Sequence, residues 1–175
     1  MTNETLQTIR SRRSCRAYEP RQITDAELDA VLEAGTYAAS AMGRQSAKIV
    51  VVQDAATRAQ LTRMNAAVMG ADSDPMYGAP TIVVVLADME KSANAWSDGC
   101  LVMGNLMNAA ASLGIGSCWI NRAKEEFESA EGKALLRQWN LPEHLVGVGH
   151  CILGYADGPV PAAKPRKADF VTYVR

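Results

Sequence analysis

The sequence predicts one domain, covering residues 1–175, in which strands alternate with helices and pack against them in layers. Two apolar runs, KIVVVQ (48–53) and APTIVVVLAD (79–88), are rich in β-branched residues, which is typical of buried strands. Between Asp98 and Leu113 almost every position is small or apolar, which predicts a helix buried on all sides. With 175 residues the chain can bury a core of its own, and no repeat or composition break marks a second domain.

Two helices are expected around the first strand. Thr24 and Glu27 have the spacing of a capping box, and apolar residues with helical spacing follow them. Asp54 directly follows the first strand and can cap a second helix, because its carboxylate can accept hydrogen bonds from free backbone N–H groups. The expected elements of this half are a helix over 25–39, a strand over 48–53, a helix from 54 to about 68 and a strand over 79–88.

The second half of the chain contains the long apolar helix, which Gly114 should end. A tail rich in proline and lysine closes the chain, and its prolines exclude a helix there. Within the tail, DFVTYV (169–174) has the composition of a strand, and if it pairs with a sheet edge, that edge could belong to another subunit. The expected elements of this half are helices over 98–113 and 122–140 and strands over 116–120 and 146–154.

Charge and hydropathy exclude several classes of protein. The chain has 18 basic and 19 acidic residues, a formal net charge of −1, so its overall field does not favour nucleic acid or an anionic membrane. No apolar run approaches the ~20 residues that span a bilayer, and the polar start MTNETLQ lacks the apolar core of a signal peptide. We therefore expect a cytoplasmic protein without nucleic-acid or membrane partners.

The four cysteines are expected to be reduced. They are widely spaced, with no C-x-x-C pair and no histidines at metal-ligand spacing, so neither zinc nor an iron–sulfur cluster is indicated. Since no secretion signal accompanies them, we favour buried free thiols over a disulfide framework, which an even number of cysteines would also permit. The residues concerned are Cys15, Cys100, Cys118 and Cys151.

Two common kinds of enzyme site are not supported by the sequence. The glycine-rich stretches GIGSC (114–118) and GVGHCILG (147–154) lack the G-x-G-x-x-G pattern, and the first leads from a helix into a strand, the reverse of a dinucleotide-binding turn. A hydrolytic nucleophile would need a base, and the only histidines, His144 and His150, have no G-x-S-x-G or comparable context. If the chain is an enzyme, we expect a cofactor to supply the reactive atom.

The stretch IRSRRSCRAYEP (9–20) carries four arginines within seven positions. One interpretation is a solvated basic turn before a helix, the usual fate of such charge runs. The other is an anion site, because several guanidinium groups and the Ser14 hydroxyl suit a compact dianionic phosphate. A second basic cluster lies in the tail, and the two could converge on one phosphate. The residues of the two clusters are Arg12, Arg13 and Arg16 with Ser14, and Lys164, Arg166 and Lys167.

Four segments of the chain, taken in order, resemble motifs of the FMN-dependent nitroreductase family. RRSCRAY (12–18) resembles its R-R-S-x-R-x-(F/Y) opening, and AASAMGRQSAKIVVV (38–52) resembles its A-P-S-G-x-N-x-Q-P-W-x-F-x-V segment. LGIGSCWI (113–120) resembles an L-G-(L/I)-G-x-x-W stretch, and GYADGPVPAAKPRK (154–167) resembles the closing G-Y-P…P-x-x-K-x-R-K pattern. The likeness touches both ends and the middle of the chain.

The resemblance implies an α+β fold with a central mixed β-sheet flanked by helices and a C-terminal tail extending onto a partner subunit. It also implies a homodimer with one FMN at each end of the subunit interface, reduced by NADH or NADPH. By position, the residues implied to bind FMN are Arg12, Arg13, Ser14, Arg16, Lys164 and Arg166, the backbone around Gly116 and Ser117, and Ser40, Gly43 and Gln45 from the partner.

Some positions depart from the family pattern. Gly43 stands where the pattern has asparagine, and Gln45, Ser46 and Ala47 stand where it has Q-P-W. The segment 64–80 is short and lacks the helical insertion of larger members. These departures bear on the choice of acceptor more than on FMN, because the phosphate anchors match.

The expected reaction is ping-pong hydride transfer from NADH or NADPH to flavin N5 and then to a nitroaromatic, a quinone or a similar small acceptor. No side chain is needed as catalytic acid or base, and Arg16 is the candidate for the positive charge that stabilises reduced flavin. The alternatives are a specialised flavin enzyme for dehalogenation or dehydrogenation, a non-catalytic FMN-binding protein, and a polyanion-binding module built on the basic clusters.

Overall fold

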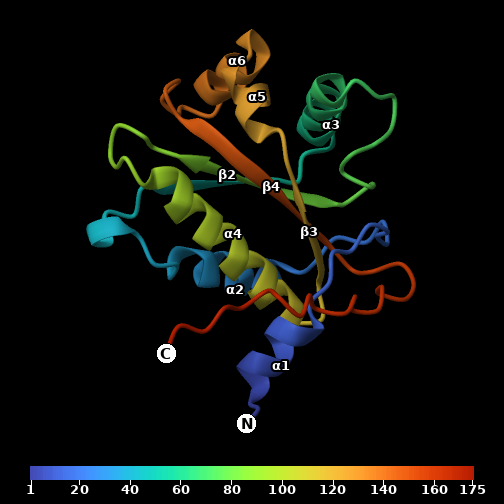
Figure 1. The fold of residues 1–175 in the computed structure, drawn as a ribbon. Helices are drawn as coiled ribbons and strands as arrows, with labels where there is room; N and C mark the ends of the chain where they lie inside the picture. Colours follow the sequence, from blue (N-terminus) through green and yellow to red (C-terminus); the bar gives the residue numbers. More distant parts are fainter.

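The computed structural model describes all residues from Met1 to Arg175 and has a four-stranded sheet at its centre. The strand order is β1-β2-β4-β3, and each neighbouring pair is antiparallel. Helices lie on both sides of this sheet (Figure 1), which confirms the expected α+β class with flanking helices. The strands are β1 (Ala47–Val52), β2 (Thr81–Ala87), β3 (Gly116–Ile120) and β4 (Val146–Gly154).

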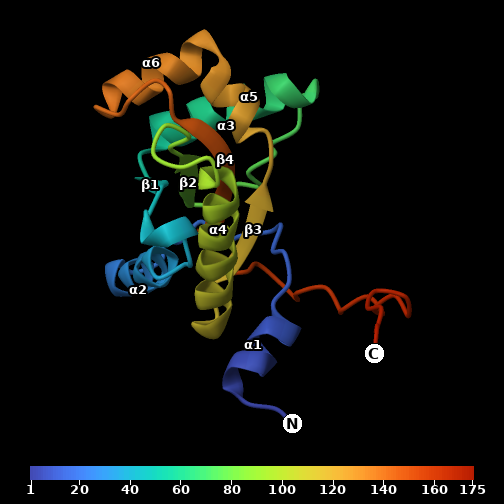
Figure 2. The same ribbon diagram turned by 60° about the vertical axis from the view of Figure 1, so that its left-hand side comes forward.

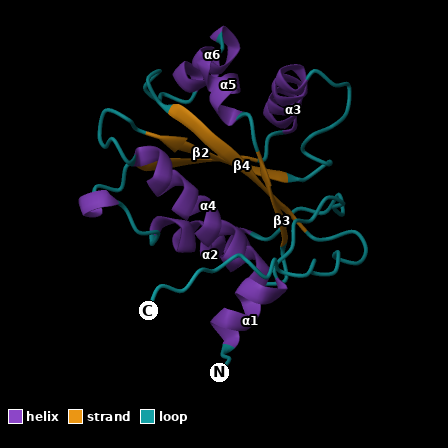
Figure 3. Ribbon diagram, in the orientation of Figure 1, coloured by secondary structure: helices purple, strands orange, loops and turns teal.

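The helices form two groups, one on each face of the sheet, as the purple elements of Figure 3 show. On one face lie α3, α5 and α6; on the other lies α4, against which α2 packs (Figure 1). The helices are α1 (Glu4–Ser11), α2 (Asp25–Thr36), the short 3₁₀ helix η1 (Ala41–Gly43), α3 (Ala55–Met69), α4 (Ala95–Ser112), α5 (Ala123–Glu128) and α6 (Ala130–Gln138).

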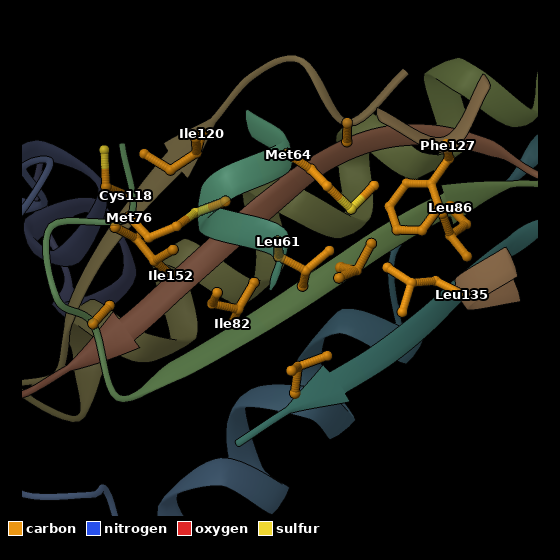
Figure 4. Packing of buried hydrophobic residues seen from close by; sticks show 14 of the residues in the cluster. Leu61, Met64, Met76, Ile82, Leu86, Cys118, Ile120, Phe127, Leu135 and Ile152 are labelled. Atoms are coloured by element: carbon orange, nitrogen blue, oxygen red, sulfur yellow. The ribbon is translucent and has the colours of Figure 1, made fainter. Parts of the chain in front are cut away.

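Strand β2 is buried on both faces, which explains why its sequence shows no polar alternation. Ile82 and Leu86 face the cluster formed with α3, α5 and α6, where Figure 4 shows them beneath Leu61 and Phe127. Val83, Val85 and Ala87 face the opposite cluster, with α2 and α4.

The four strands predicted before the tail all form, within two residues of the expected bounds. The capping box at Thr24 and Glu27 and the cap at Asp54 are both present. The first expected helix is shorter than predicted, because α2 ends at Thr36, and the long apolar helix α4 begins earlier, at Ala95.

The prediction of one helix over 122–140 is wrong, since the chain breaks there into α5 and α6. Ser129 causes the break: its backbone is extended, with φ −70° and ψ 160°. Its hydroxyl accepts a hydrogen bond from Gly132 N at 3.0 Å and so caps the second helix. The helix α1 was not predicted at all; its apolar residues, Leu6 and Ile9, are exposed, and it buries no residue of the chain.

Within this chain the segment 169–174 forms no strand, and its expected pairing with the edge of another subunit stays a prediction. Residues 157–175 are all exposed and extend away from the sheet (Figure 2). A strand needs a neighbour for its backbone hydrogen bonds, and no sheet edge of this chain lies alongside the segment. None of the helices has the length and apolar character needed to cross a membrane.

Candidate functional site

The segment between α1 and α2, which we call the arm (residues 12–23), is fastened to the ends of two strands. Cys15 N donates to Ser117 O at 2.9 Å at the start of β3, and Ser14 and Ser117 form an isolated parallel bridge. Farther along, Tyr18 bridges Ala156 just beyond β4. The arm and the beginning of the tail therefore lie side by side, although they come from opposite ends of the chain.

Buried anchors alternate in the arm with residues that face outward. Cys15 and Tyr18 are buried, and the Tyr18 hydroxyl donates to Cys15 O at 2.9 Å. Burial raises the pKa of Tyr18 above its ordinary value, so the phenol stays neutral. Gly116 allows the close approach, because a Cβ at that position would lie 2.8 Å from Cys15 Sγ. This anchoring leaves the exposed Arg16 facing outward.

Basic side chains from the arm and the tail line one hollow of about 630 Å³. No acidic residue lines it, and none of its basic residues forms a salt bridge within the chain. The structure thus brings together the two basic clusters recognised in the sequence, except for Lys167, which does not line the hollow. Its basic residues are Arg10, Arg12, Arg13, Arg16, Lys164 and Arg166, and Ser14 lies among them.

Several polar atoms at this place have no partner in the chain. Arg12 Nη1, Arg13 Nε and Ser117 Oγ are buried and make no hydrogen bond. Buried donors normally find partners, so their clustering here indicates a site that a polar ligand completes. Burial raises the pKa of the Cys151 thiol to about 12, and the nearby charge of Arg12 opposes this rise.

The other basic side chains of the hollow have different local roles. Arg13 Nη1 donates to Arg10 O at 2.7 Å and Arg12 O at 2.6 Å, so this guanidinium fixes the end of α1. Arg166 folds back onto its own segment and donates to Lys164 O. Arg16 lies exposed.

The predicted residues of the second segment do not reach this hollow within one chain. Ser40, Gly43 and Gln45 lie at the N-terminal end of α4, where Ala41 N donates to Asp98 Oδ1 at 3.0 Å. The arm lies toward the opposite end of α4 (Figure 1), and 18 helical residues span about 27 Å. One chain therefore keeps its two predicted sets of cofactor ligands apart.

Two groups of polar residues were not recognised in the sequence. Asp98 and Ser46 form a buried pair beside the Ser40 segment; the only sequence signal was one acidic residue in the first turn of an apolar helix. Glu126 accepts a hydrogen bond from Asn65 and contacts His150 Nε2 at 2.9 Å, all three being buried. No local pattern reveals this second group, because its members lie on α3, α5 and β4.

Both histidines make polar contacts within the chain. His150 is fully buried against Glu126, and His144 Nε2 lies 3.2 Å from Asp88 Oδ1. All four cysteines are free thiols; Cys15, Cys118 and Cys151 are buried, and Cys100 is half-buried. No group of three or more His, Cys, Asp or Glu side chains could hold a metal ion.

Comparisons with known proteins agree with the motifs. The Nitroreductase family model matches residues 9–155. A protein of Archaeoglobus fulgidus, provisionally named NADH dehydrogenase/NAD(P)H nitroreductase, is 34% identical over 156 residues, 87% of this chain and 85% of that protein. A Bacteroides fragilis nitroreductase crystallised with FMN is similar at a TM-score of 0.90 and 34% identity, covering 99% of this chain and 100% of that one. A Desulfitobacterium hafniense nitroreductase with bound FMN has a TM-score of 0.89 and 28% identity, with full coverage of both chains.

Proposed function

Because this chain belongs to the nitroreductase family, we propose that it is an FMN-dependent oxidoreductase. It takes electrons from NADH or NADPH and passes them to a nitroaromatic, a quinone or a similar small acceptor. The observation that carries this proposal is the hollow of about 630 Å³ in which basic residues from both ends of the chain meet without acidic partners. Support also comes from two similar solved structures that contain FMN.

The residues of the hollow fit the phosphate of FMN. Arg12 has a buried, unpartnered Nη1, and Ser14 adds a short hydroxyl donor beside it. Lys164 and Arg166 approach from the tail, so charge comes from two sides. Guanidinium groups bind phosphate oxygens with charge-assisted, often paired hydrogen bonds. We assign these four residues to phosphate binding.

The flavin ring, when bound, supplies the redox chemistry by accepting a hydride from the nicotinamide and releasing electrons to the acceptor in a ping-pong sequence. The chain then has to bind and orient the cofactor, and the lining of the hollow contains no histidine or carboxylate. We assign Arg16 the role of favouring the reduced cofactor electrostatically, since a guanidinium stays charged at every working pH. Arg13 contributes by fixing the arm against α1.

We propose that two copies of the chain complete each site. Ser40, Gly43 and Gln45 are separated from their own hollow by the length of α4, so a partner must supply them. The tail carries exposed apolar side chains, including Phe170 and Tyr173, that nothing in the chain covers. Such side chains are suited to a subunit interface. A single FMN-binding domain over 1–175, a homodimer and a cytoplasmic location are parts of this proposal.

The first test of this function is the colour of the purified protein. A preparation that is yellow, releases FMN on denaturation and bleaches with NADH or NADPH without oxygen supports the proposal. A colourless protein that cannot be reconstituted with FMN contradicts it. A panel of nitroaromatics, quinones and halogenated compounds would then separate general nitroreduction from a specialised flavin reaction.

A sharper test uses Arg12→Ala. Loss of one charge-assisted hydrogen bond, worth about 1.5–3 kcal/mol, should weaken FMN binding roughly 10- to 150-fold in a fluorescence titration of the apoprotein. Arg63→Ala is the matched control, because Arg63 lies on α3 and pairs with Glu131 outside the hollow. Equal affinities for both variants would overturn the phosphate assignment.

A further inference from the structure

The segment from Ser40 to Ser46, which we call the clamp loop, has an unusual backbone. Met42, Gly43 and Gln45 all lie in the left-handed region, with φ of 55°, 65° and 48°. Two of these residues are not glycine, and side chains with a Cβ adopt this region rarely. Such a conformation persists only where its surroundings hold it in place.

A single carboxylate holds both ends of the clamp loop. Asp98 Oδ1 accepts a hydrogen bond from Ala41 N at 3.0 Å, and Asp98 Oδ2 accepts one from the Ser46 hydroxyl at 2.5 Å. Asp98 is 4% exposed and Ser46 is 1% exposed, so water does not compete for these bonds. Asp98 also lies in the first turn of α4, where the helix dipole favours a negative charge.

Apolar packing does not support the clamp loop from behind. A hollow of about 260 Å³ lies there, bordered by Ser40, Gln45, Ala47 and Asp98 among others. Ala47 is the position at which the family pattern has tryptophan, so a small side chain borders the space. Hydrogen bonds, rather than packing, therefore keep the loop in shape: besides the two bonds to Asp98, Gln45 N donates to Ser40 Oγ and Lys91 Nζ donates to Gln45 O.

The tip of the clamp loop, Met42 and Gly43, projects from its own chain, whereas Arg44 and Gln45 bond to Lys91. Met42 is 86% exposed, and a Cβ at Gly43 would meet no atom within 4 Å. The strained backbone of the clamp loop does not bury apolar side chains in the core of its own subunit. Strained backbone of this kind clusters at ligand-binding segments, which indicates that a group outside the chain binds there.

We propose that Asp98 is a positioning residue for the cofactor: by clamping Ala41 and Ser46, it presents Ser40 and Gln45 to the FMN held by the partner subunit. This inference rests on the proposed function. Without the clamp, the loop would sample other conformations and would have to be ordered on binding. The apparent FMN affinity would then equal the intrinsic affinity multiplied by the fraction of molecules in which the loop holds its binding conformation.

The experiment compares FMN dissociation constants of apoprotein variants, measured by fluorescence titration well below every melting temperature. Asp98→Ala should weaken binding about tenfold, as expected if the loop is competent roughly a tenth of the time. Asp98→Asn keeps an oxygen for Ala41 N and an amide for the Ser46 hydroxyl, so it should restore most of the affinity. Unchanged affinity in Asp98→Ala would overturn the proposal.

The matched control is Asp54→Ala. Asp54 is also a carboxylate at a helix start, and it accepts hydrogen bonds from Thr57 N and the Thr57 hydroxyl, but it is remote from the clamp loop. Its removal should lower the melting temperature and leave the FMN affinity unchanged. An equal loss of affinity in Asp54→Ala would show that Asp98 acts only through general stability and would overturn the proposal.

A double-mutant cycle with Ser40→Ala tests whether Asp98 acts through the loop. If it does, Asp98→Ala should cost less affinity in the Ser40→Ala background than in the unmodified protein, because only Gln45 is then left to be presented. If the losses of FMN affinity in the two single variants simply multiply in the double variant, the mechanism is contradicted.

Ser46→Ala removes only one of the two hydrogen bonds to Asp98 and should give an intermediate loss of FMN affinity. This variant keeps the test decisive if Asp98→Ala does not fold. If Arg12→Ala weakens FMN binding and Asp98→Ala does not, this inference alone fails and the proposed function stands.

Discussion

Gly116→Ala is a direct way to ask whether the arm must lie close against β3 for the cofactor to bind. A methyl group at this position would lie 2.8 Å from Cys15 Sγ, 2.9 Å from Cys15 Cβ and 3.1 Å from Gly154 O. Nonbonded carbon atoms prefer about 3.5–4.0 Å, so Cys15 must retreat by roughly 1 Å. Its N–H is bonded to Ser117 O at 2.9 Å, and that bond would stretch or break.

The expected magnitudes follow from this displacement. Overpacking of a buried contact costs about 1–3 kcal/mol, which for a chain of this size lowers the melting temperature by roughly 2–12 °C. Ser14 and Arg16 flank Cys15 in the arm and move with it. Loss of one charge-assisted bond to the phosphate should then weaken FMN binding about 10- to 150-fold.

The assay is a fluorescence titration of apoprotein with FMN, alongside thermal denaturation by circular dichroism. Leu135→Ala is the control: Leu135 is 2% exposed on α6, far from the arm, and its truncation should cost about 2–5 kcal/mol. It should lower the melting temperature as much as Gly116→Ala while leaving the FMN affinity intact. Retained affinity in Gly116→Ala, or equal loss in both variants, would refute the reasoning.

Two further predictions concern titrating groups that do not line the hollow. Hydrogen bonds from Tyr155 and Thr24 hold the pKa of Glu27 below its usual value. The carboxylate therefore stabilises the folded state at pH values above its unfolded-state pKa. This stabilisation is lost as the pH falls through its folded-state pKa. Glu27→Gln should therefore lower the melting temperature at neutral pH, and the difference from the unmodified protein should close on acidification; a constant difference would contradict this. Burial raises the pKa of Cys151 to about 12, so iodoacetamide at about pH 8 should leave it unlabelled in the native protein. Mass spectrometry of the native protein should find no label on any cysteine except the half-buried Cys100. Modification of Cys151 before denaturation would show that solvent reaches this thiol in the native protein and would contradict the prediction.

Elements with strong local signals were predictable from the sequence. Strand β2 was recognisable because it is buried on both faces and therefore consists of consecutive apolar residues. Strand β1 was recognisable from its β-branched residues, but the expectation that it is buried is wrong, because β1 is an edge strand and only Val52 of it is buried. The caps at Thr24 and Asp54 were recognisable because a cap acts on backbone groups only three residues away.

Elements whose conformation depends on distant contacts were mispredicted. Ser129 ends α5 and starts α6, yet a serine is compatible with a continuous helix, so the local pattern could not reveal the break. The helix α1 has only two apolar residues, Leu6 and Ile9, which is too short a pattern to identify a helix. The segment 169–174 forms no strand within this chain, because a strand needs a neighbour with which to pair, and its expected pairing with another subunit stays a prediction.

The sequence by itself determined which chemistry is available: guanidinium groups around Ser14, lysine and arginine in the tail, and no base for hydrolysis. Only the tertiary structure decided which of these groups meet. Backbone bonds from Cys15 to Ser117 and from Asp157 to Ala17 close loops of more than a hundred residues, and they bring both ends of the chain to one hollow. The same structure holds Ser40 at the far end of α4, clamped by Asp98. The type of a residue can be read from the sequence one position at a time. The pairing of residues more than a hundred positions apart depends on the register of the whole sheet, and no short segment of the sequence specifies that register.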